Sequence, residues 1–260
     1  MHPSLPELLS TARVVALPLA QRFRGIETRE AVLLRGPQGW TEFSPFVEYD
    51  DTESSAWLSA ALDFGWNATP TTLRDSIRVN ATLPAIAASD VRRVLQLFPG
   101  CRTVKVKVAE RGQSLAEDIE RVSAARDWLG AEGRVRIDAN GAWGVNEAER
   151  AIRMLSPFDL EYAEQPCASV AELSELRTRI ADLGIPVAAD ESVRKASDPL
   201  AVARAGAADI LVIKAQPLGG IFAALRVVAD AGLPVVVSSA LDTSVGLAMG
   251  AYLAAAAPEL

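Results

Sequence analysis

Short apolar runs that end in a charged residue recur along this chain at an almost constant interval. Asp138, Glu164, Asp190 and Lys214 close four such runs, so the steps between them are 26, 26 and 24 residues. An interval of that length accommodates one strand, one helix and two loops. Helical patterns fill the gaps, over Ser114–Trp128, Asn146–Leu155, Val170–Leu183, Pro199–Ala205 and Ile221–Ala231. Repeated βα units close most readily into a (β/α)8 barrel, whose working residues lie at the C-terminal ends of its strands.

Seven barrel strands are expected, over residues 78–86, 103–108, 135–140, 160–165, 187–192, 210–215 and 234–240. The N-terminal part does not follow this rhythm, since Arg13–Leu17, Ile26–Leu34 and Trp40–Phe43 have strand patterns and Asp51–Phe64 has a helical one. We therefore predict an α/β protein with an α+β capping domain over residues 1–72 and a barrel over residues 73–260. The segment Leu19–Gly25, which carries Arg22, Phe23 and Arg24, is either a solvated loop or a lid over an anionic ligand.

The strand count leaves the barrel one strand short. Only three residues follow the expected helix Val245–Ala257. A barrel of seven strands would leave backbone groups of its first and last strands unpaired. We therefore interpret the C-terminal end as truncated, expect the native protein to continue beyond Leu260 with an eighth strand, and expect the 260-residue chain alone to be poorly soluble and weakly active.

Charge and composition exclude several classes of partner. The chain has 26 basic and 33 acidic residues, a net charge of -7, which does not favour nucleic acid or an anionic membrane surface. The N-terminus has no basic segment followed by a long apolar one, as a secretory signal would, and the apolar stretch Val245–Ala257 is too short to span a bilayer. We expect a cytoplasmic protein with neither nucleic acid nor membrane partners, and we favour a monomer.

Two lysines share one face of the expected strand Thr103–Val108. Because side chains alternate along a strand, Lys105 and Lys107 point one way and three valines point the other. Taken alone, this pattern fits an edge strand whose lysines discourage pairing with another molecule. The charged residues at the ends of the following strands favour the alternative, in which the lysines line a polar cavity.

Three carboxylates are expected to meet at the ends of neighbouring strands. Asp138, Glu164 and Asp190 end successive strands, and parallel strands lie about 4.8 Å apart. Acids held that close repel one another unless a cation neutralises them. An all-oxygen site suits Mg2+, with Mn2+ as a substitute, better than zinc. The alternative is that Arg136 and the two lysines simply pair with the acids.

Lysines beside such a site suggest proton chemistry next to a carboxylate. Two ammonium groups two residues apart are expected to lower each other's pKa, so that one becomes a usable base. A divalent cation would stabilise the enediolate that forms when the proton leaves. Lys214 stands at the end of a more distant strand, and is expected across the barrel.

These residues resemble a known family. The Lys-x-Lys strand, IDAN at Asp138, AEQP at Glu164, ADES at Asp190 and Lys214 are similar to the enolase superfamily, in its muconate-lactonizing subgroup. The runs RFRGIETREAVLLRG and GWTEFSPFVEYDD resemble the o-succinylbenzoate synthases of menaquinone biosynthesis, of the actinobacterial type. The resemblance implies a modified TIM barrel with a small capping domain.

The resemblance also implies an activity, the Mg2+-dependent syn-dehydration of a small anionic substrate, 2-succinyl-6-hydroxy-2,4-cyclohexadiene-1-carboxylate, to 2-succinylbenzoate. Lys107 would be the acid and base, Lys214 would stabilise the anionic intermediate, and Lys105 would tune Lys107 and bind substrate. The metal ligands would be Asp138, Glu164 and Asp190. Further substrate contacts are expected from residues in strand ends and loops: Asn140, Gly219, Gly220, Ser238 and Ser239.

Two other functions stay open. An N-succinylamino acid racemase or dipeptide epimerase would use the same metal site, with Lys107 and Lys214 on the two faces of the substrate. An inactive fragment or binding scaffold is the third possibility, supported by the missing strand. Acid-sugar dehydratases and mandelate-type racemases use a barrel histidine, and the sole histidine here is His2.

Overall fold

The computed structural model describes residues 3–23, 25–194 and 198–258. Packing divides the chain into two compact units. Unit 1 joins Met1–Ile77 to Val212–Leu260, and unit 2 is Arg78–Leu211. Strand β9 (Ile210–Ile213) runs from unit 2 into unit 1. The predicted domain boundary after residue 72 stays a prediction.

The N-terminal part of unit 1 is an antiparallel sheet in the order β1-β2-β3. Its strands are β1 (Arg13–Phe23), β2 (Ile26–Gly36) and β3 (Gly39–Phe43). All three strands were expected, but β1 is longer than its pattern suggested. The prediction of a loop is wrong for Leu19–Phe23, because pairing resumes after an irregularity and Phe23 pairs with Ile26. Arg24 and the side chains of Arg22 and Phe23, which the lid interpretation requires, lie outside the described residues.

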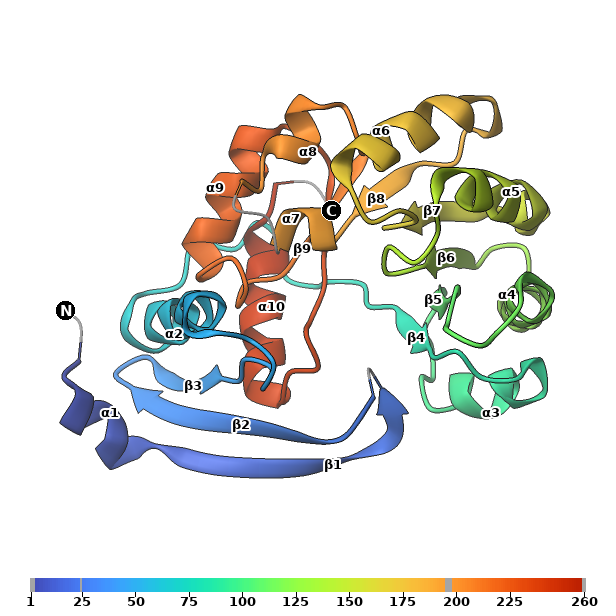
Figure 1. Cartoon of the computed structure of the whole chain (residues 1–260). Coiled ribbons are helices and arrows are strands. Elements are labelled where there is room, and N and C mark those ends of the chain that lie inside the picture. Colours follow the sequence, from blue (N-terminus) through green and yellow to red (C-terminus); the bar gives the residue numbers. More distant parts are fainter. Residues whose placement is uncertain (1–2, 24, 195–197, 259–260) are drawn as a thin grey trace. The chain divides into compact units, whose positions relative to one another are not determined.

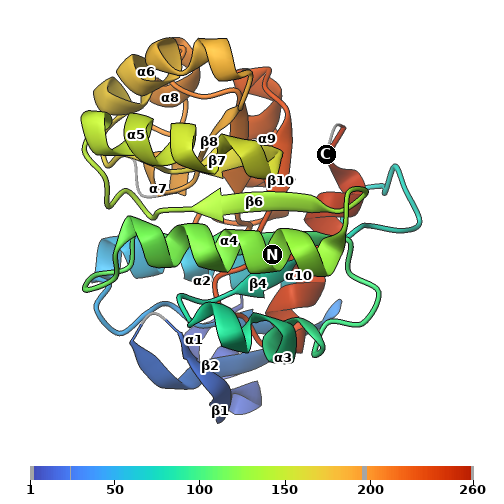
Figure 2. The same ribbon diagram turned by 90° about the vertical axis from the view of Figure 1, so that its right-hand side faces the viewer.

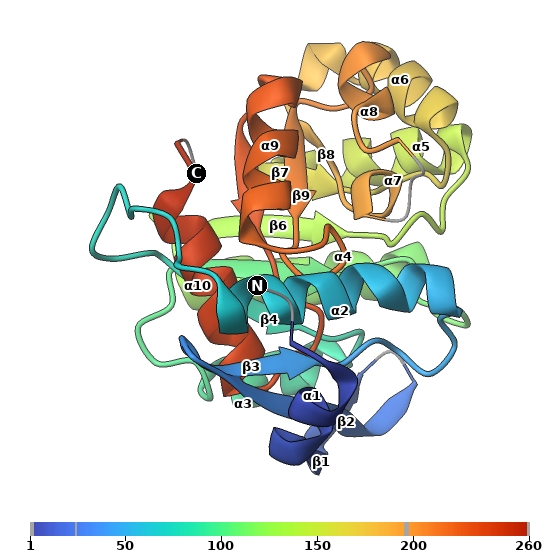
Figure 3. The same cartoon turned by 90° about the vertical axis from the view of Figure 1, so that its left-hand side faces the viewer.

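Helices and one further strand complete unit 1. They are α1 (Leu5–Thr11), α2 (Asp51–Trp66), α9 (Ile221–Ala231), β10 (Val235–Val237) and α10 (Ser244–Ala256). Asp50 is the N-cap of helix α2, because its side chain accepts a hydrogen bond from the Glu53 backbone N–H. Helices α2 and α10 both lie along β3 (Figures 1 and 3). Sequence analysis missed α1, whose start is a capping box between Ser4 and Glu7.

The packing of α10 depends on a glycine. A Cβ at Gly246 would lie 2.7 Å from Gln216 Nε2 and 2.9 Å from Glu42 Oε2. We therefore expect Gly246→Ala to lower the free energy of unfolding by about 1 to 3 kcal/mol, the usual cost of overpacking. The matched control is Gly250→Ala in the same helix, where a Cβ meets nothing within 4 Å. Gly250→Ala should stabilise by about 0.5 to 1 kcal/mol through helix propensity. Urea unfolding measures both; equal effects would contradict the close packing at Gly246.

Unit 2 is built from parallel strands in sequence order. They are β4 (Ala81–Leu83), β5 (Thr103–Lys107), β6 (Arg134–Asp138), β7 (Leu160–Glu164), β8 (Val187–Ala189) and the start of β9. Each pairs with the next in parallel. The seventh strand, β10, belongs to unit 1 and is next to β9 in the sheet order. All seven expected βα strands are therefore present. The predicted α/β fold is confirmed.

Helices cover the outer side of these strands. The longer ones are α3 (Val91–Leu95), α4 (Leu115–Leu129), α5 (Val145–Leu155) and α6 (Val170–Arg179), and Figures 1 and 2 show them along one side of the strands. Shorter turns are η1 (Ala88–Asp90), η2 (Ser156–Phe158), η3 (Ala181–Leu183), α7 (Glu191–Arg194) and α8 (Ala201–Arg204). Capping boxes start α4 at Ser114 and α6 at Ser169. These helices bury their apolar sides, which leaves the C-terminal strand ends for polar residues.

No helix in the described part of the chain has both the length and the apolar character that a membrane span requires.

Candidate active site

The charged residues of unit 2 meet at the C-terminal edge of its strands. Lys107 of β5 pairs in register with Asp138 of β6, and Asp138 pairs with Glu164 of β7. Asp190 follows the last residue of β8 directly. Parallel pairing therefore places these residues at one edge, as the strand pattern predicted.

Both lysines form short ion pairs with the carboxylates. Lys105 Nζ lies 2.7 Å from Glu164 Oε1 and 3.0 Å from Asp138 Oδ2. Lys107 Nζ lies 2.6 Å from the same Asp138 oxygen. The side chains of Asp138 and Glu164 are 1% and 0% exposed, so water screens these pairs little. The expected polar cluster exists, and its two lysines pair with Asp138 and Glu164.

The electrostatics of Lys105 contradict one expectation. Burial alone would lower the pKa of Lys105, but the carboxylates of Glu164, Asp138 and Asp190 outweigh burial and hold that pKa well above its usual value. For Lys105, the prediction that the two ammonium groups lower each other's pKa is therefore wrong, because it neglected the acids. Burial opposes ionisation of Asp138, yet Lys105 and Lys107 keep the pKa of Asp138 below its usual value.

Asn140 lies between Lys107, the candidate base, and Glu191, which follows Asp190. Its backbone N–H donates to Asp138 Oδ1 at 3.0 Å, and its side-chain oxygen accepts from Lys107 Nζ at 2.7 Å. Its amide nitrogen lies 3.3 Å from Glu191 Oε1. Asn140 has a φ of 48°, a left-handed conformation that asparagine tolerates better than most residues. The structure thus places Asn140 in the cluster, whereas its predicted contact with substrate stays a prediction.

Gln165 supports the loop that carries Asp190. This fully buried side chain accepts hydrogen bonds from the backbone N–H groups of Asp190 (2.9 Å) and Ser192 (3.2 Å). Its amide nitrogen donates to Cys167 O and Ser192 Oγ, at 2.9 and 2.7 Å. Sequence reasoning did not single out Gln165, although it follows Glu164 directly in AEQP.

Gln165→Ala is expected to lower the free energy of unfolding by about 3 kcal/mol, because each buried group left without a partner costs about 1 to 3 kcal/mol. Urea unfolding measures the change. The control is Gln38→Ala at an exposed turn, where about 0.5 kcal/mol or less is expected. If the two variants unfold alike, Gln165 does not support the Asp190 loop.

The donor set fits a hard divalent cation in chemistry. Three buried carboxylates on successive strands offer only oxygen, the ligand that Mg2+ and Mn2+ prefer. Their oxygens are not gathered for a metal here, since the described residues contain no cluster of three or more acidic, histidine or cysteine side chains in such an arrangement. Lys105 and Lys107 pair with Asp138 and Glu164 instead, so both arrangements predicted from the sequence are compatible with the donor set.

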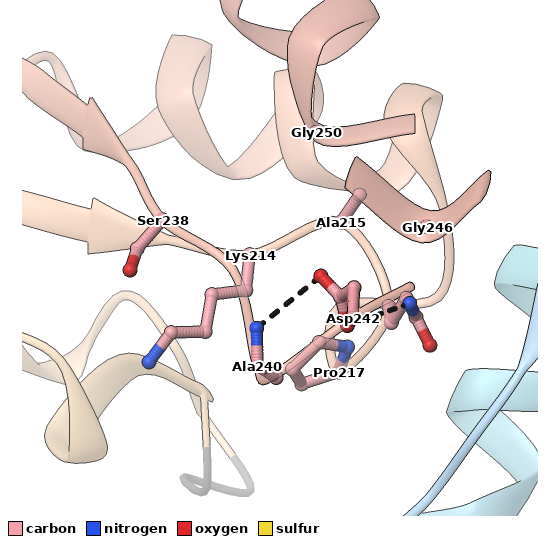
Figure 4. Close-up of a pocket in the computed structure, with 9 residues that line it drawn as sticks. Lys214, Ala215, Pro217, Ser238, Ala240, Asp242, Gly246 and Gly250 are labelled. Atoms are coloured by element: carbon pink, nitrogen blue, oxygen red, sulfur yellow. Dashed lines mark hydrogen bonds between the residues drawn. The ribbon is translucent and has the colours of Figure 1, made fainter. Parts of the chain in front are cut away.

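Lys214 belongs to unit 1, where it lines a small pocket. The pocket is formed by the loops after β9 and β10 and by helix α10, with Lys214, Ala215, Gln216, Pro217, Ser238, Ala240, Asp242, Gly246 and Gly250 in its wall (Figure 4). Lys214 is 8% exposed, and its side chain extends away from Asp242 (Figure 4). The pocket wall therefore contains both an ammonium group and a carboxylate.

The other predicted substrate contacts are placed less uniformly. Ser238 lines the pocket, but Ser239 is exposed and does not. Gly219 and Gly220 form the turn into α9, and a Cβ at Gly220 would lie 2.6 Å from Asp63 Oδ2. The requirement for glycine at position 220 is thus explained by its φ of 121° and by the close approach of Asp63. Contact of these four residues with substrate stays a prediction.

Two protein-family models match the chain. They are described as "Enolase N-terminal domain-like", over residues 14–65, and "Enolase C-terminal domain-like", over residues 87–260. The o-succinylbenzoate synthase of Thermobifida fusca is 56% identical over 253 residues, which cover 96% of this chain and 78% of that protein. The o-succinylbenzoate synthase of Mycobacterium tuberculosis H37Rv is 57% identical over 259 residues, again covering 78% of the relative. The chain belongs to the o-succinylbenzoate synthase family of the enolase superfamily. The resemblance inferred from the strand-end motifs is confirmed.

Solved structures agree with this family's fold. The L-Ala-D/L-Glu epimerase of Bacillus subtilis has a TM-score of 0.79 at 23% identity, covering 95% of this chain and 86% of that one. The muconate lactonizing enzyme of Pseudomonas putida has a TM-score of 0.74 at 21% identity, covering 96% and 84%. At these identities the likeness concerns the fold alone.

Proposed function

We propose that this member of the o-succinylbenzoate synthase family dehydrates 2-succinyl-6-hydroxy-2,4-cyclohexadiene-1-carboxylate to 2-succinylbenzoate. The observation that carries the proposal is the cluster of Lys105, Lys107, Asp138 and Glu164 at the C-terminal ends of adjacent strands, with ion pairs of 2.6 to 3.0 Å. The family's curated relatives supply the reaction. The cluster supplies a lysine and carboxylates suited to removing a proton next to a carboxyl group.

Lys107 is the proposed acid and base. Its neutral amine takes the proton from the carbon that bears the substrate carboxylate, and the C–H electron pair moves onto the carboxylate to form an enediolate. Lys107, now an ammonium, gives that proton to the ring hydroxyl on the same face, so the C–O bond breaks and water leaves. The ring electrons close the aromatic system, which drives the second step. Asn140, whose oxygen lies 2.7 Å from Lys107 Nζ, orients the amine.

Asp138, Glu164 and Asp190 are the proposed ligands of Mg2+, for which Mn2+ can substitute. When bound, the metal supplies positive charge that offsets the negative charge developing on the substrate carboxylate. Lys105 contacts two of the proposed ligands, at 2.7 and 3.0 Å, so it offsets part of their negative charge, and it then binds a substrate oxygen. Lys214 stabilises the anionic intermediate by charge and by cation–π contact with the ring. Its placement in a pocket wall supports a role in binding the substrate.

The proposal also covers the pathway, the cellular location and the oligomeric state of the protein. The product is a precursor in menaquinone biosynthesis, as the family implies, and we propose a cytoplasmic enzyme with a small anionic substrate. We also propose that the protein is a monomer, and that the capping domain ends and the barrel begins after residue 72.

Racemisation of an N-succinylamino acid, or epimerisation of a dipeptide, is the second candidate. Lys107 and Lys214 together favour it, because racemisation requires an acid or base on each face of a carbon. Steady-state assays with the cyclohexadiene substrate and with N-succinyl amino acids compare the two through kcat/KM. A higher kcat/KM for dehydration supports the synthase. A higher value for racemisation reverses the assignment, and ligand binding without turnover of either substrate indicates a scaffold.

A further inference from the structure

A chain of polar side chains, of which three are buried and Asp242 is half-buried, connects three segments of unit 1. Ser44 Oγ donates to Glu42 Oε1 at 2.7 Å and lies 3.4 Å from Gln216 Oε1. Gln216 Nε2 donates to Asp242 Oδ1 at 2.9 Å. We name these four residues the Glu42–Asp242 chain. It runs from β3 and the residue after it, through the loop after β9, to the loop after β10.

Both ends of the chain are fixed to the backbone. Glu42 Oε2 accepts hydrogen bonds from the N–H groups of Thr243 and Gly246, at 3.1 and 2.9 Å, at the start of α10. The positive end of that helix favours a carboxylate there. At the other end, Asp242 Oδ2 accepts from the Ala240 N–H at 3.2 Å (Figure 4). The chain therefore holds the loop after β10 at two points.

The middle of the chain lies next to Lys214. Gln216 is two residues from Lys214 and is 3% exposed. Its backbone is fixed as well, because Gly219 N–H donates to Gln216 O at 3.1 Å and Gly220 N–H donates to Ala215 O at 2.9 Å. With the side chain and the following turn both held, the backbone at Lys214 has little freedom. The Lys214 side chain extends away from Asp242 (Figure 4). Asp242 therefore acts on Lys214 through Gln216 and the peptide chain, and not by direct contact.

Keeping a carboxylate at Asp242 opposes folding at neutral pH. Burial, and then the carboxylate of Glu42 on β3, raise the pKa of Asp242 to about 6. Arg29 of β2 and Lys214 act in the opposite direction but do not cancel the rise. Arg29 also fixes the same loop, because its Nε donates to Leu241 O at 2.9 Å. An acid that destabilises its own fold invites a functional explanation.

We infer that Asp242 is a positioning residue for Lys214, acting through Gln216, with Glu42 and Ser44 holding the far end of the chain. The inference rests on the proposed function, in which Lys214 stabilises the anionic intermediate. Loss of Asp242 frees the loop after β9 and displaces the ammonium group from its place. A displacement of about 1 Å is enough to cost about 100-fold in rate.

The kinetic test compares Asp242→Ala, Gln216→Ala and the double variant in the Mg2+-loaded protein. Each single variant should lower kcat by about 10- to 100-fold with KM little changed. Because both residues belong to one chain, the double variant should lose no more than the worse single variant. Asp182→Ala, which removes a surface acid paired with Arg153, is the control and should keep the wild-type kcat. The inference would be overturned if the fold-losses in kcat of the two single variants multiplied in the double variant, or if Asp242→Ala kept the wild-type kcat.

A second readout does not depend on turnover. The 13C-methyl NMR signal of reductively methylated Lys214, assigned by its loss in Lys214→Arg, should shift in Asp242→Ala and stay in place in Asp182→Ala. If the wild-type protein turns over no cyclohexadiene substrate but this signal shifts, the proposed function fails and the positioning role stands. An unmoved signal in Asp242→Ala overturns the positioning role, whatever the turnover.

The titration of Asp242 gives a pH-dependent prediction. A folded-state pKa of about 6, raised from the ordinary carboxyl value of 3.8, means that the folded protein binds this proton more tightly than the unfolded chain does. Stability from this group is therefore full below pH 3.8 and is lost as the pH rises to about 6. The free energy of unfolding of wild type minus that of Asp242→Asn should fall over this window and be constant above it. Urea unfolding across the pH range measures this difference, and a flat difference would contradict the raised pKa of Asp242.

Discussion

Lys107→Arg should lower kcat for dehydration by about 10²- to 10⁴-fold, the usual contribution of a general acid–base group. Arginine keeps a cation beside Asp138, which lies 2.6 Å from Lys107 Nζ in the wild type. A guanidinium with a pKa above about 12 does not give up its proton to serve as a base. The variant thus separates the charge of Lys107 from its proton transfer. Steady-state kinetics with the Mg2+-loaded protein measures the loss.

Arg153→Lys is the control for a basic-residue exchange, since Arg153 is a half-exposed surface residue paired with Asp182. It should leave kcat at the wild-type value. Exchange of the substrate's α proton with solvent deuterium provides a second measurement, and it should stop in Lys107→Arg. A variant that still exchanges this proton at the wild-type rate would show that another group is the base.

Asp138→Asn is expected to have an even broader effect, because Asp138 is both a proposed metal ligand and the shared partner of Lys105 and Lys107. Removing a metal worth several kcal/mol in the transition state lowers turnover by about 10³-fold or more. The stabilisation of the folded state by Mg2+ should also be lost. For wild type, that stabilisation is about 2.7 kcal/mol when Mg2+ is at 100 times its Kd.

Thermal unfolding with and without Mg2+ measures this second effect without any substrate. Asp182→Asn, an exposed acid paired with Arg153, should show the wild-type response to Mg2+. Glu164→Gln and Asp190→Asn should behave like Asp138→Asn. A turnover rate that chelator does not change would show that the three carboxylates do not hold a catalytic metal.

The sequence pattern predicted well which residues lie at the C-terminal edge of the sheet, because the local sequence determines where each strand ends. An apolar run followed by Asp138, Glu164, Asp190 or Lys214 marks both the end of the strand and the side chain placed there. Parallel pairing then brings the ends of neighbouring strands together, whatever the loops between them. The three N-terminal strands were identified for the same reason.

Long-range contacts could not be inferred from such local patterns. The raised pKa of Lys105 depends on Glu164, at the end of β7, and on Asp190, directly after β8. Gln165 and Gln216 are uncharged and outside the alternating pattern, so nothing local marks them as supports of the loops they hold. Glu42 was visible as the one acid in GWTEF, but its partners at Thr243 and Gly246 lie about 200 positions away in the chain.

The most direct test of the account is a 1H NMR time course of the Mg2+-loaded protein with 2-succinyl-6-hydroxy-2,4-cyclohexadiene-1-carboxylate. We expect the ring signals of the substrate to be replaced by the aromatic signals of 2-succinylbenzoate at a rate that falls with chelator and nearly vanishes in Lys107→Arg. Substrate that persists at the uncatalysed rate with wild-type protein would contradict the proposed function. Aromatic product formed equally fast by Lys107→Arg would contradict the role of Lys107.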